Sequence, residues 1–284
     1  MRRGIAVNDK STVLVLGGTG KTGSRVAQRL ESLGVPIRIG SRTATPTFDW
    51  ENPASWAPAL LDVGAAYVSF QPDLAVPGAP QAVRAFGEMA AAAGVRRLVL
   101  LSGRGEEEAQ LAEKLLAETG PELTVVRSSF FAQNFTEGQF AQAIRDGQLI
   151  LPVGAVPEPF IDIEDIADVA VAALTEDGHG GKIYEVTGPR LLTFAEAVAE
   201  ISAVTGRPIE YLEVTPEEYR AALIADGLPG ELVEFLLYLF TTVLDGRNAR
   251  IDDGVRQALG WGARDFGDFA RAASATGVWD ESPR

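Results

Sequence analysis

The chain has 284 residues, of which 46% are hydrophobic and 23% charged, proportions that are ordinary for a globular protein with a core. It has no cysteine, which excludes disulfides and zinc–cysteine sites, and its one histidine, His179, lies in a Glu-Asp-Gly-His-Gly-Gly run typical of a surface turn. We therefore expect neither a metal site nor a Ser-His-Asp triad, and the net charge of −14 disfavours direct nucleic-acid binding.

Two stretches of the chain bear on membrane targeting, the N-terminal segment and residues 232–244. The first eleven residues contain two arginines with no apolar run behind them, so they do not resemble a secretory signal. The most apolar later stretch, residues 232–244, contains Glu234 and is shorter than a bilayer span. We expect a buried or pocket-lining helix there, no membrane association and a cytoplasmic protein.

The first half of the chain alternates strand and helix signals. Apolar runs predict strands at residues 12–16, 36–40, 65–70, 97–102 and 123–127. Helical spacing with glycine or proline at the ends predicts helices at residues 20–33, 54–61, 80–93 and 106–119. Such alternation implies right-handed crossovers and a parallel sheet covered on both faces.

The second half is less regular and mainly helical. Residues 161–175 favour a helix, residues 182–187 a strand, and residues 209–214 resemble a strand. Thr193 with Glu196 and Thr215 with Glu218 fit capping boxes that begin two helices. The fold class predicted is α/β: a Rossmann doubly wound parallel sheet over residues 11–188 and a smaller, mostly helical substrate or partner subdomain over residues 189–284. Residues 136–160 are expected on the substrate side.

The strongest motif is the run Val13-Leu-Val-Leu-Gly-Gly-Thr-Gly-Lys-Thr-Gly23, which leaves a predicted strand and opens a predicted helix. Glycines at 17, 20 and 23 allow a tight turn, close approach of a pyrophosphate to the backbone, and close helix–strand packing. The alternative is a purely structural turn. A Walker phosphate loop is excluded, because its leading glycine would fall on Val15.

The end of the second predicted strand bears on the choice of cofactor. An acid that would take the 2′-hydroxyl of NAD is missing before Asp49, whereas Arg42 could pair with the 2′-phosphate of NADP. We therefore predict NADP(H) in preference to NAD(H). The alternative is a solvated loop arginine.

With these residues in view, the chain resembles the NmrA-like branch of the atypical short-chain dehydrogenases/reductases from Val13 to about Phe269. The resemblance also rests on six further runs: Phe48-Asp-Trp50, Ala117-Glu-Thr-Gly120, Thr124-Val-Val-Arg127, Phe131-Ala-Gln-Asn134-Phe, Phe160-Ile-Asp-Ile-Glu-Asp165-Ile-Ala and Tyr184-Glu-Val-Thr-Gly-Pro189. It implies that Asp49 approaches the adenine, that Ser69 to Gln71 run along the cofactor, and that Ser128 to Phe131 lie beside the nicotinamide.

One departure from the wider superfamily concerns catalysis. Its catalytic members use a Tyr-x-x-x-Lys pair, but here Lys114 is preceded at that distance by Gln110. Lys114 either reaches the nicotinamide ribose and assists catalysis, as its position in the family implies, or is a solvated helix lysine. The residues expected at the cofactor are Gly17, Thr19, Gly20, Lys21, Thr22, Gly23, Ser41, Arg42, Asp49, Ser69, Phe70, Gln71, Ser102, Lys114, Ser128 and Phe131.

Aromatic side chains suggest a substrate pocket. Its expected members are Phe130, Phe131, Asn134, Phe135 and Tyr238, although aromatics at such spacings can equally form a core. Asp162 and Asp165 resemble paired catalytic carboxylates, but we prefer the interpretation that Asp162 or Glu164 caps a helix.

Two functions fit the sequence. The first is an NADPH-dependent reductase of a small quinone-like or carbonyl substrate, in which Lys114, Ser102 or water assists charge on oxygen. The second is a non-catalytic NADP(H)-binding redox sensor that acts through a protein partner. The glycine loop does not discriminate between them, because both need it.

Overall fold

The fold is that of a computed structural model, which describes residues 12–280. The segment 1–11, on which the expectation about a secretory signal rests, and the first residue of the predicted Rossmann domain lie outside the described residues. The chain forms two compact units: residues 12–128, Ile163–Val186 and Asp253–Gly262 make the first, and Ser129–Asp162, Thr187–Asp252 and residues 263–280 the second.

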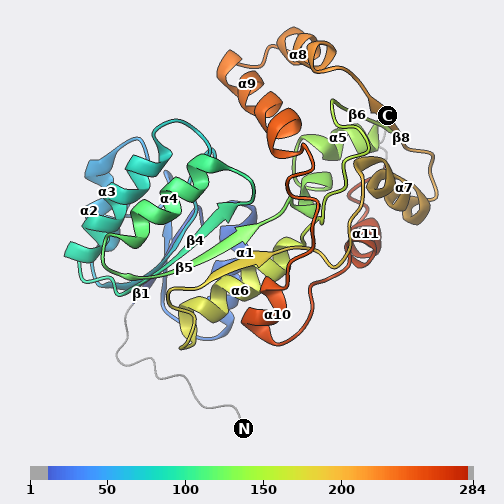
Figure 1. The fold of residues 1–284 in the computed structure, drawn as a ribbon. Coiled ribbons are helices and arrows are strands. Elements are labelled where there is room, and N and C mark those ends of the chain that lie inside the picture. The colour runs from blue at the N-terminus through green and yellow to red at the C-terminus, as the bar shows by residue number, and fades with distance from the viewer. Residues whose placement is uncertain (1–11, 281–284) are drawn as a thin grey trace. The chain divides into compact units, whose positions relative to one another are not determined.

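The first unit is built on a six-stranded parallel sheet in the order β2-β1-β3-β4-β5-β7 (Figure 1). The strands are β1 (Thr12–Leu16), β2 (Ile37–Gly40), β3 (Val63–Val68), β4 (Arg97–Gly103), β5 (Glu122–Ser128) and β7 (Ile183–Val186). All run the same way, so their carboxyl ends meet at one edge of the sheet. The chain leaves β1 towards β2 on one side and returns to β3 on the other, which makes that edge beside β1 the topological switch point.

Helices cover both faces of this sheet (Figure 1). One face carries a 3₁₀ turn, η1 (Pro53–Ser55), and the helices α2 (Trp56–Leu60), α3 (Ala79–Ala92) and α4 (Glu107–Ala117). The other carries α1 (Lys21–Ser32), α6 (Ile163–Thr175) and α10 (Gly254–Leu259). The predicted Rossmann class is confirmed.

Alternating side chains of the central strands fill the core beneath α3 and α4. Leu14 and Leu16 of β1 and Leu98 and Leu100 of β4 pack there with Phe86 of α3, and all are buried. The intervening residues of these strands face the other helical layer. Strands buried on both faces read as continuous apolar runs, which is why the sequence displays them so clearly.

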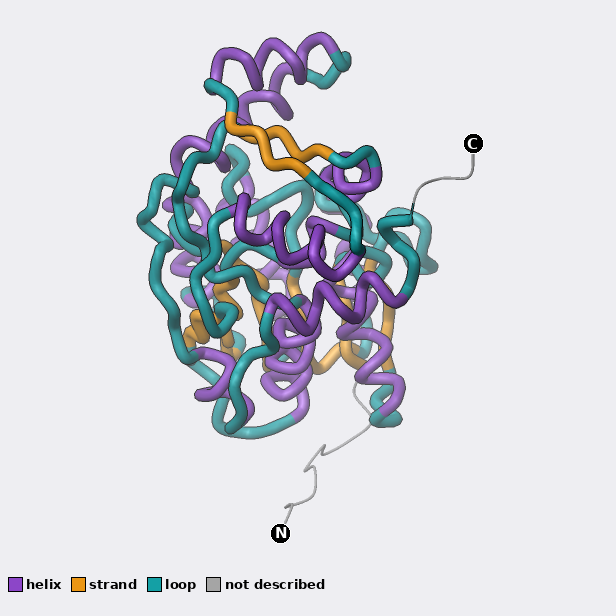
Figure 2. The backbone as a smooth tube through the Cα atoms, turned by 90° about the vertical axis from the view of Figure 1, so that its right-hand side faces the viewer, coloured by secondary structure: helices purple, strands orange, loops and turns teal. Residues whose placement is uncertain are grey.

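The second unit is mainly helical. It contains a 3₁₀ turn η2 (Ala132–Phe135), helices α5 (Gln139–Arg145), α7 (Phe194–Thr205), α8 (Pro216–Ala225), α9 (Gly230–Tyr238) and α11 (Phe266–Ala275), and a π-helical turn η3 (Leu239–Val243). Strands β6 (Gln148–Leu151) and β8 (Glu210–Glu213) run side by side and parallel (Figure 2). Both predicted capping boxes are confirmed: the hydroxyl oxygens of Thr193 and Thr215 accept hydrogen bonds from backbone N–H groups of Glu196 and Glu218.

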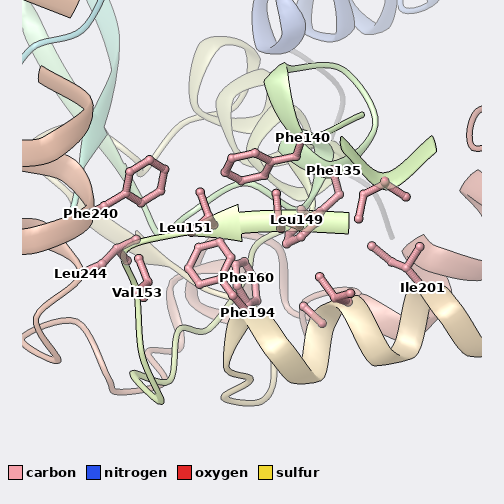
Figure 3. Packing of buried hydrophobic residues seen from close by; sticks show 14 of the residues in the cluster. Phe135, Phe140, Leu149, Leu151, Val153, Phe160, Phe194, Ile201, Phe240 and Leu244 are labelled. Atoms are coloured by element: carbon pink, nitrogen blue, oxygen red, sulfur yellow. The ribbon is translucent and has the colours of Figure 1, made fainter. Parts of the chain in front are cut away.

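Aromatic rings dominate the core of the second unit (Figure 3). Phe135, Phe160 and Phe194 are fully buried, and the ring centroids of Phe160 and Phe194 lie 5.1 Å apart in an edge-to-face arrangement. Trp279 closes the cluster, and its indole N–H donates to the carbonyl of Phe135 at 2.8 Å. Aromatic pairs in an edge-to-face arrangement stabilise a core by more than the burial of their surface area alone.

The structure differs from the sequence prediction at several points. The units are not contiguous: residues 129–162, which include the segment 136–160 expected on the substrate side, belong to the second unit, and residues 253–262 return to the first. Strand β3 begins two residues earlier than predicted and leaves Phe70 outside it. The surface-turn prediction for His179 is wrong for its side chain, which is buried with Nδ1 2.9 Å from the hydroxyl of Tyr184. No described helix is long and apolar enough to cross a membrane.

Candidate functional site

The glycine run forms a tight turn between β1 and α1. Gly17 has a φ of +63°. Two hydrogen bonds hold the turn: the N–H of Gly17 donates to the carbonyl of Gly40 (3.0 Å), and the N–H of Gly20 donates to the carbonyl of Gly17 (2.8 Å). A Cβ on Gly23 would overlap the carbonyl of Gly17. Glycine at 17 is therefore needed for the backbone conformation, and glycine at 23 for the close approach of α1 to the turn.

Gly20 plays a different part. Its φ of −89° and ψ of −179° suit any residue, and a Cβ there would lie 3.3 Å from the carbonyl oxygen of Gly17. Neither strain nor a severe clash requires glycine at this position. What glycine provides is an open backbone at the N-terminus of α1, where the first N–H groups of a helix have no partner within it and attract anions.

Residues after β3 border this turn. The Cβ of Ser69 lies 3.5 Å from a Cβ built on Gly17, and the amide nitrogen of Gln71 lies 3.7 Å from one built on Gly20. The indole N–H of Trp50 donates to the carbonyl of Ser69 at 3.1 Å, and the Trp50 ring packs against Phe70 with centroids 4.8 Å apart. The Phe48-Asp-Trp50 run thus fixes the segment from Ser69 to Gln71 beside the glycine turn.

Asp49 is fixed through its backbone. Its carbonyl accepts hydrogen bonds from the indole N–H of Trp56 (2.7 Å) and the hydroxyl of Ser55 (3.3 Å), while its carboxylate accepts from the N–H of Glu51 (3.1 Å). The side chain is half-buried. Its approach to an adenine remains a prediction.

Two arginines lie at the end of β2, and the structure separates them. The guanidinium of Arg38 donates to the backbone carbonyls of Ala59 (2.8 Å) and Leu61 (2.5 Å) and so holds the α2 segment. Arg42 follows the strand and is exposed, next to the half-buried Ser41. Of these two arginines, Arg42 is the one whose side chain is exposed at the carboxyl edge of the sheet.

A buried polar chain lies behind the ends of β4, β5 and β7. The hydroxyl of Ser102 donates to Glu113 of α4 at 2.5 Å, and Arg127 of β5 donates to both Glu113 (Nε, 3.0 Å) and Glu185 (Nη1, 2.8 Å). Arg104 donates to the other oxygen of Glu185 at 3.2 Å. Hydrogen bonding to Glu113 raises the pKa of Arg127. Two arginines balance two glutamates, so a charged network is buried without net charge.

Lys114 and Glu113 point in opposite directions from α4. Glu113 is buried in the polar chain, whereas Lys114 is exposed, as is Gln110 one turn before it. The exposure of Lys114 is compatible with both interpretations, and its catalytic role stays a prediction. Ser128, which ends β5, is buried, and its hydroxyl donates to the carbonyl of Ser102 at 3.1 Å.

Sequence reasoning missed two acidic side chains at this edge. Asp73 follows β3, Glu106 precedes α4, and their carboxyl groups are hydrogen-bonded to each other. Burial, followed by the charge of Asp73, raises the pKa of Glu106 to about 9. No local pattern signals the pair, because the two residues come from different crossovers.

The candidate substrate residues belong to the second unit. Phe135 is fully buried in the aromatic core, which fits the alternative that it is structural. Phe130, Phe131, Asn134 and Tyr238 are half-buried. The last four remain proposed substrate contacts.

Two of the acidic candidates of residues 160–165 have structural partners. The carboxylate of Asp162 accepts a hydrogen bond from the amide of Gln133 at 2.6 Å. Glu164 accepts from Arg25 (2.6 Å) and Arg29 (2.5 Å) of α1, so it joins α6 to α1. These contacts are structural, and capping of α6 by Asp162 or Glu164 stays a prediction.

Comparisons with known proteins agree with this architecture, although no family model matches the chain. The NAD(P)H azoreductase of Xenophilus azovorans is 33% identical over 285 residues, which cover 93% of this chain and 98% of that protein. An uncharacterised oxidoreductase of Bacillus subtilis is also 33% identical, over 96% of this chain and 99% of its own length. Among solved structures, an NADPH-dependent quinone oxidoreductase of Escherichia coli in complex with NADPH superposes with a TM-score of 0.78 at 22% identity, over 92% of this chain and 99% of that one. Triphenylmethane reductase of Citrobacter in complex with NADP(H) does so with a TM-score of 0.73 at 19% identity, over 93% and 99%.

Proposed function

Because the chain belongs to the NmrA-like branch of the atypical short-chain dehydrogenases/reductases and is 33% identical to two oxidoreductases, we propose that it is an NADPH-dependent reductase of small, electron-poor organic acceptors. The proposed substrates are quinone-like and carbonyl compounds. Azo compounds are a further candidate class, because a relative is an azoreductase. The glycine turn at the N-terminus of α1, with its open backbone at Gly20, supports binding of the dinucleotide. The observation that carries the choice of a reductase over a sensor is the 33% identity to an NAD(P)H azoreductase over 93% of this chain.

The residues present fit a dinucleotide. The turn from Gly17 to Gly23 would hold the pyrophosphate, the segment from Ser69 to Gln71 borders it, and the switch point beside β1 is where such folds bind dinucleotides. When bound, the reduced nicotinamide supplies the hydride.

A preference for NADP(H) over NAD(H) is supported by the end of β2. No acid lies between Gly40 and Asp49, and the exposed Arg42 can pair its guanidinium with a 2′-phosphate. Arg38 is committed to backbone carbonyls and cannot substitute for it.

The absence of a Tyr-x-x-x-Lys pair bears on the substrate class. A simple ketone that accepts hydride becomes a strongly basic alkoxide, whereas a reduced quinone is a stabilised phenolate. We expect turnover to favour quinones over unactivated aliphatic ketones. Efficient reduction of an aliphatic ketone would contradict this expectation.

The test is incubation of the protein with NADPH and a panel of quinones, azo dyes and carbonyl compounds, followed by the loss of NADPH absorbance. Turnover with at least one electron-poor acceptor supports the proposal. Tight NADPH binding without turnover on any acceptor would refute it and favour the alternative, a redox sensor that acts through a protein partner.

A further inference from the structure

The paired carboxyl groups of Asp73 and Glu106 lie at the carboxyl edge of the first unit. Glu106 stands just before α4, and its side chain folds back over Gly103, the last residue of β4. A Cβ on Gly103 would overlap the Glu106 carboxyl group, so the close approach depends on glycine at this position. Glu106 is only 7% exposed, whereas Asp73 is half-buried and is the more accessible of the two.

A hydrogen bond between two carboxyl groups requires one proton, because an ionised carboxylate can only accept. Burial raises the pKa of Asp73, but its carboxylate accepts the backbone N–H of Ala75 at 2.9 Å, and this hydrogen bond favours the ionised form. The Oε2 atom of Glu106 is buried and receives no hydrogen bond from an N–H or O–H group of the described residues. The proton therefore resides on Glu106. Three nearby acidic groups, Asp73, Glu108 and Glu113, act on Glu106, and their negative charges raise its pKa further.

The position of the pair matches the reactive half of a bound dinucleotide. With the pyrophosphate at the glycine turn and the 2′-phosphate near Arg42 after β2, the adenosine half extends over β2. The nicotinamide half would then extend to the other side of β1, over the ends of β3 and β4 and towards Ser128 at the end of β5. Asp73 follows β3 and Glu106 follows β4, so the pair lies at the ends of two of these strands.

On the premise of the proposed function, we propose that the Asp73–Glu106 pair is the proton donor for reduction, in place of the tyrosine that this chain lacks. With an azo acceptor, one nitrogen of the N=N bond gains a hydride and its electron pair from the reduced nicotinamide. The other nitrogen takes the proton from Glu106, which gives the hydrazine and leaves both carboxyl groups ionised. Water then returns a proton to the pair through the half-buried Asp73.

Two acceptors separate hydride transfer from proton transfer. Crystal violet is a cation that hydride alone converts to its neutral leuco form, whereas methyl red needs a hydride and a proton. For Glu106→Gln and Asp73→Asn, we expect methyl red reduction to fall by roughly 10²–10⁴-fold. Crystal violet reduction and NADPH binding should stay within about twofold of wild type. Glu118→Gln, an exposed acid at the C-terminal end of the same helix, is the matched control and should change none of the three.

The pH profile and infrared absorption give independent readouts. Methyl red turnover by the wild type should fall as the pH rises through about 9, where Glu106 loses its proton. At neutral pH the wild type should show the carbonyl stretch of a protonated carboxyl group, and Glu106→Gln should lack it.

The possible failures are distinguishable. Equal losses with both acceptors, or unchanged methyl red turnover in both variants, would overturn the proton-donor role and leave the reductase proposal standing. A wild type that binds NADPH but reduces neither dye would overturn the role, and if it also reduces no quinone or carbonyl compound of the panel, the reductase proposal falls with it. A protonated-carboxyl band that persists in Glu106→Gln would overturn the assignment of the proton.

Discussion

The two glycines at 20 and 23 give the sharpest test of dinucleotide binding, because one substitution should affect binding and the other the fold. At Gly20, the backbone angles suit any residue, and a Cβ would meet only the Gly17 carbonyl oxygen, at 3.3 Å, and the Gln71 amide, at 3.7 Å. Replacing an N-cap glycine should cost about 1 kcal/mol of stability. That corresponds to a melting temperature lower by roughly 2–4 °C.

The effect of Gly20→Val on binding should be much larger. The branched side chain would occupy the space through which a pyrophosphate reaches the first N–H groups of α1. Losing two charge-assisted hydrogen bonds at about 1.5–3 kcal/mol each weakens NADPH binding by roughly 10²–10⁴-fold. Calorimetric titration with NADPH, with circular-dichroism melting on the same samples, measures both quantities.

Gly23→Ala is the contrasting variant. Its methyl group would overlap the Gly17 carbonyl, a backbone group that cannot move aside cheaply, so we expect a stability loss of about 1–3 kcal/mol. A folded Gly20→Val protein with unchanged NADPH affinity would refute the assignment of the turn to the pyrophosphate.

Three further predictions follow from the geometry. Arg42→Ala should weaken NADPH binding by roughly 10- to 100-fold and barely change NADH binding, whereas Arg84→Ala, an exposed arginine on α3, should change neither; equal losses for the two cofactors would contradict the role of Arg42. Glu106→Gln should gain stability relative to wild type as the pH rises from 4.5 to about 9. The folded pKa of Glu106 lies above its ordinary value of 4.5, so the protonated Glu106 contributes fully to the stability of the wild type below pH 4.5, and this contribution is lost as the pH rises to about 9. If urea unfolding at several pH values gave the same stability difference between the two proteins throughout, this prediction would be contradicted. Phe135→Ala should cost about 3–5 kcal/mol in chemical unfolding, and Phe235→Ala, which is half-buried outside the aromatic core, clearly less; similar losses would mean that Phe135 is not a core residue.

Local signals in the sequence suffice for the first unit and fail for contacts between distant segments. Each parallel strand is an apolar run that ends near glycine or proline, so β1, β2, β4 and β5 are predicted nearly to the residue. The short elements α5 and β6 carry too few periodic residues to be recognised. In the charged helix α4, composition does not reveal that Glu113 faces inward while Lys114 faces outward, because this depends on Ser102 and Arg127 from two strands.

The candidate site divides in the same way. The glycine turn could be identified because its residues lie in one short run: Gly17 and Gly23 have steric reasons, and Gly20 leaves the backbone open. The Asp73–Glu106 pair could not, since it needs two crossovers to end at neighbouring strands and a glycine at 103 to admit the carboxyl group. The burial of His179 likewise depends on Tyr184, to which no turn motif points.

The return of residues 253–262 to the first unit has a consequence for how the protein is made. Gly254 begins α10 so close to β7 that a Cβ there would overlap the carbonyl of Glu185. During synthesis the ribosome must therefore release most of the second unit before the first can acquire its last helix. A fragment that stops at residue 188 would leave β7 and α6 without α10, and such a truncation would expose apolar surface rather than yield an autonomous nucleotide-binding domain.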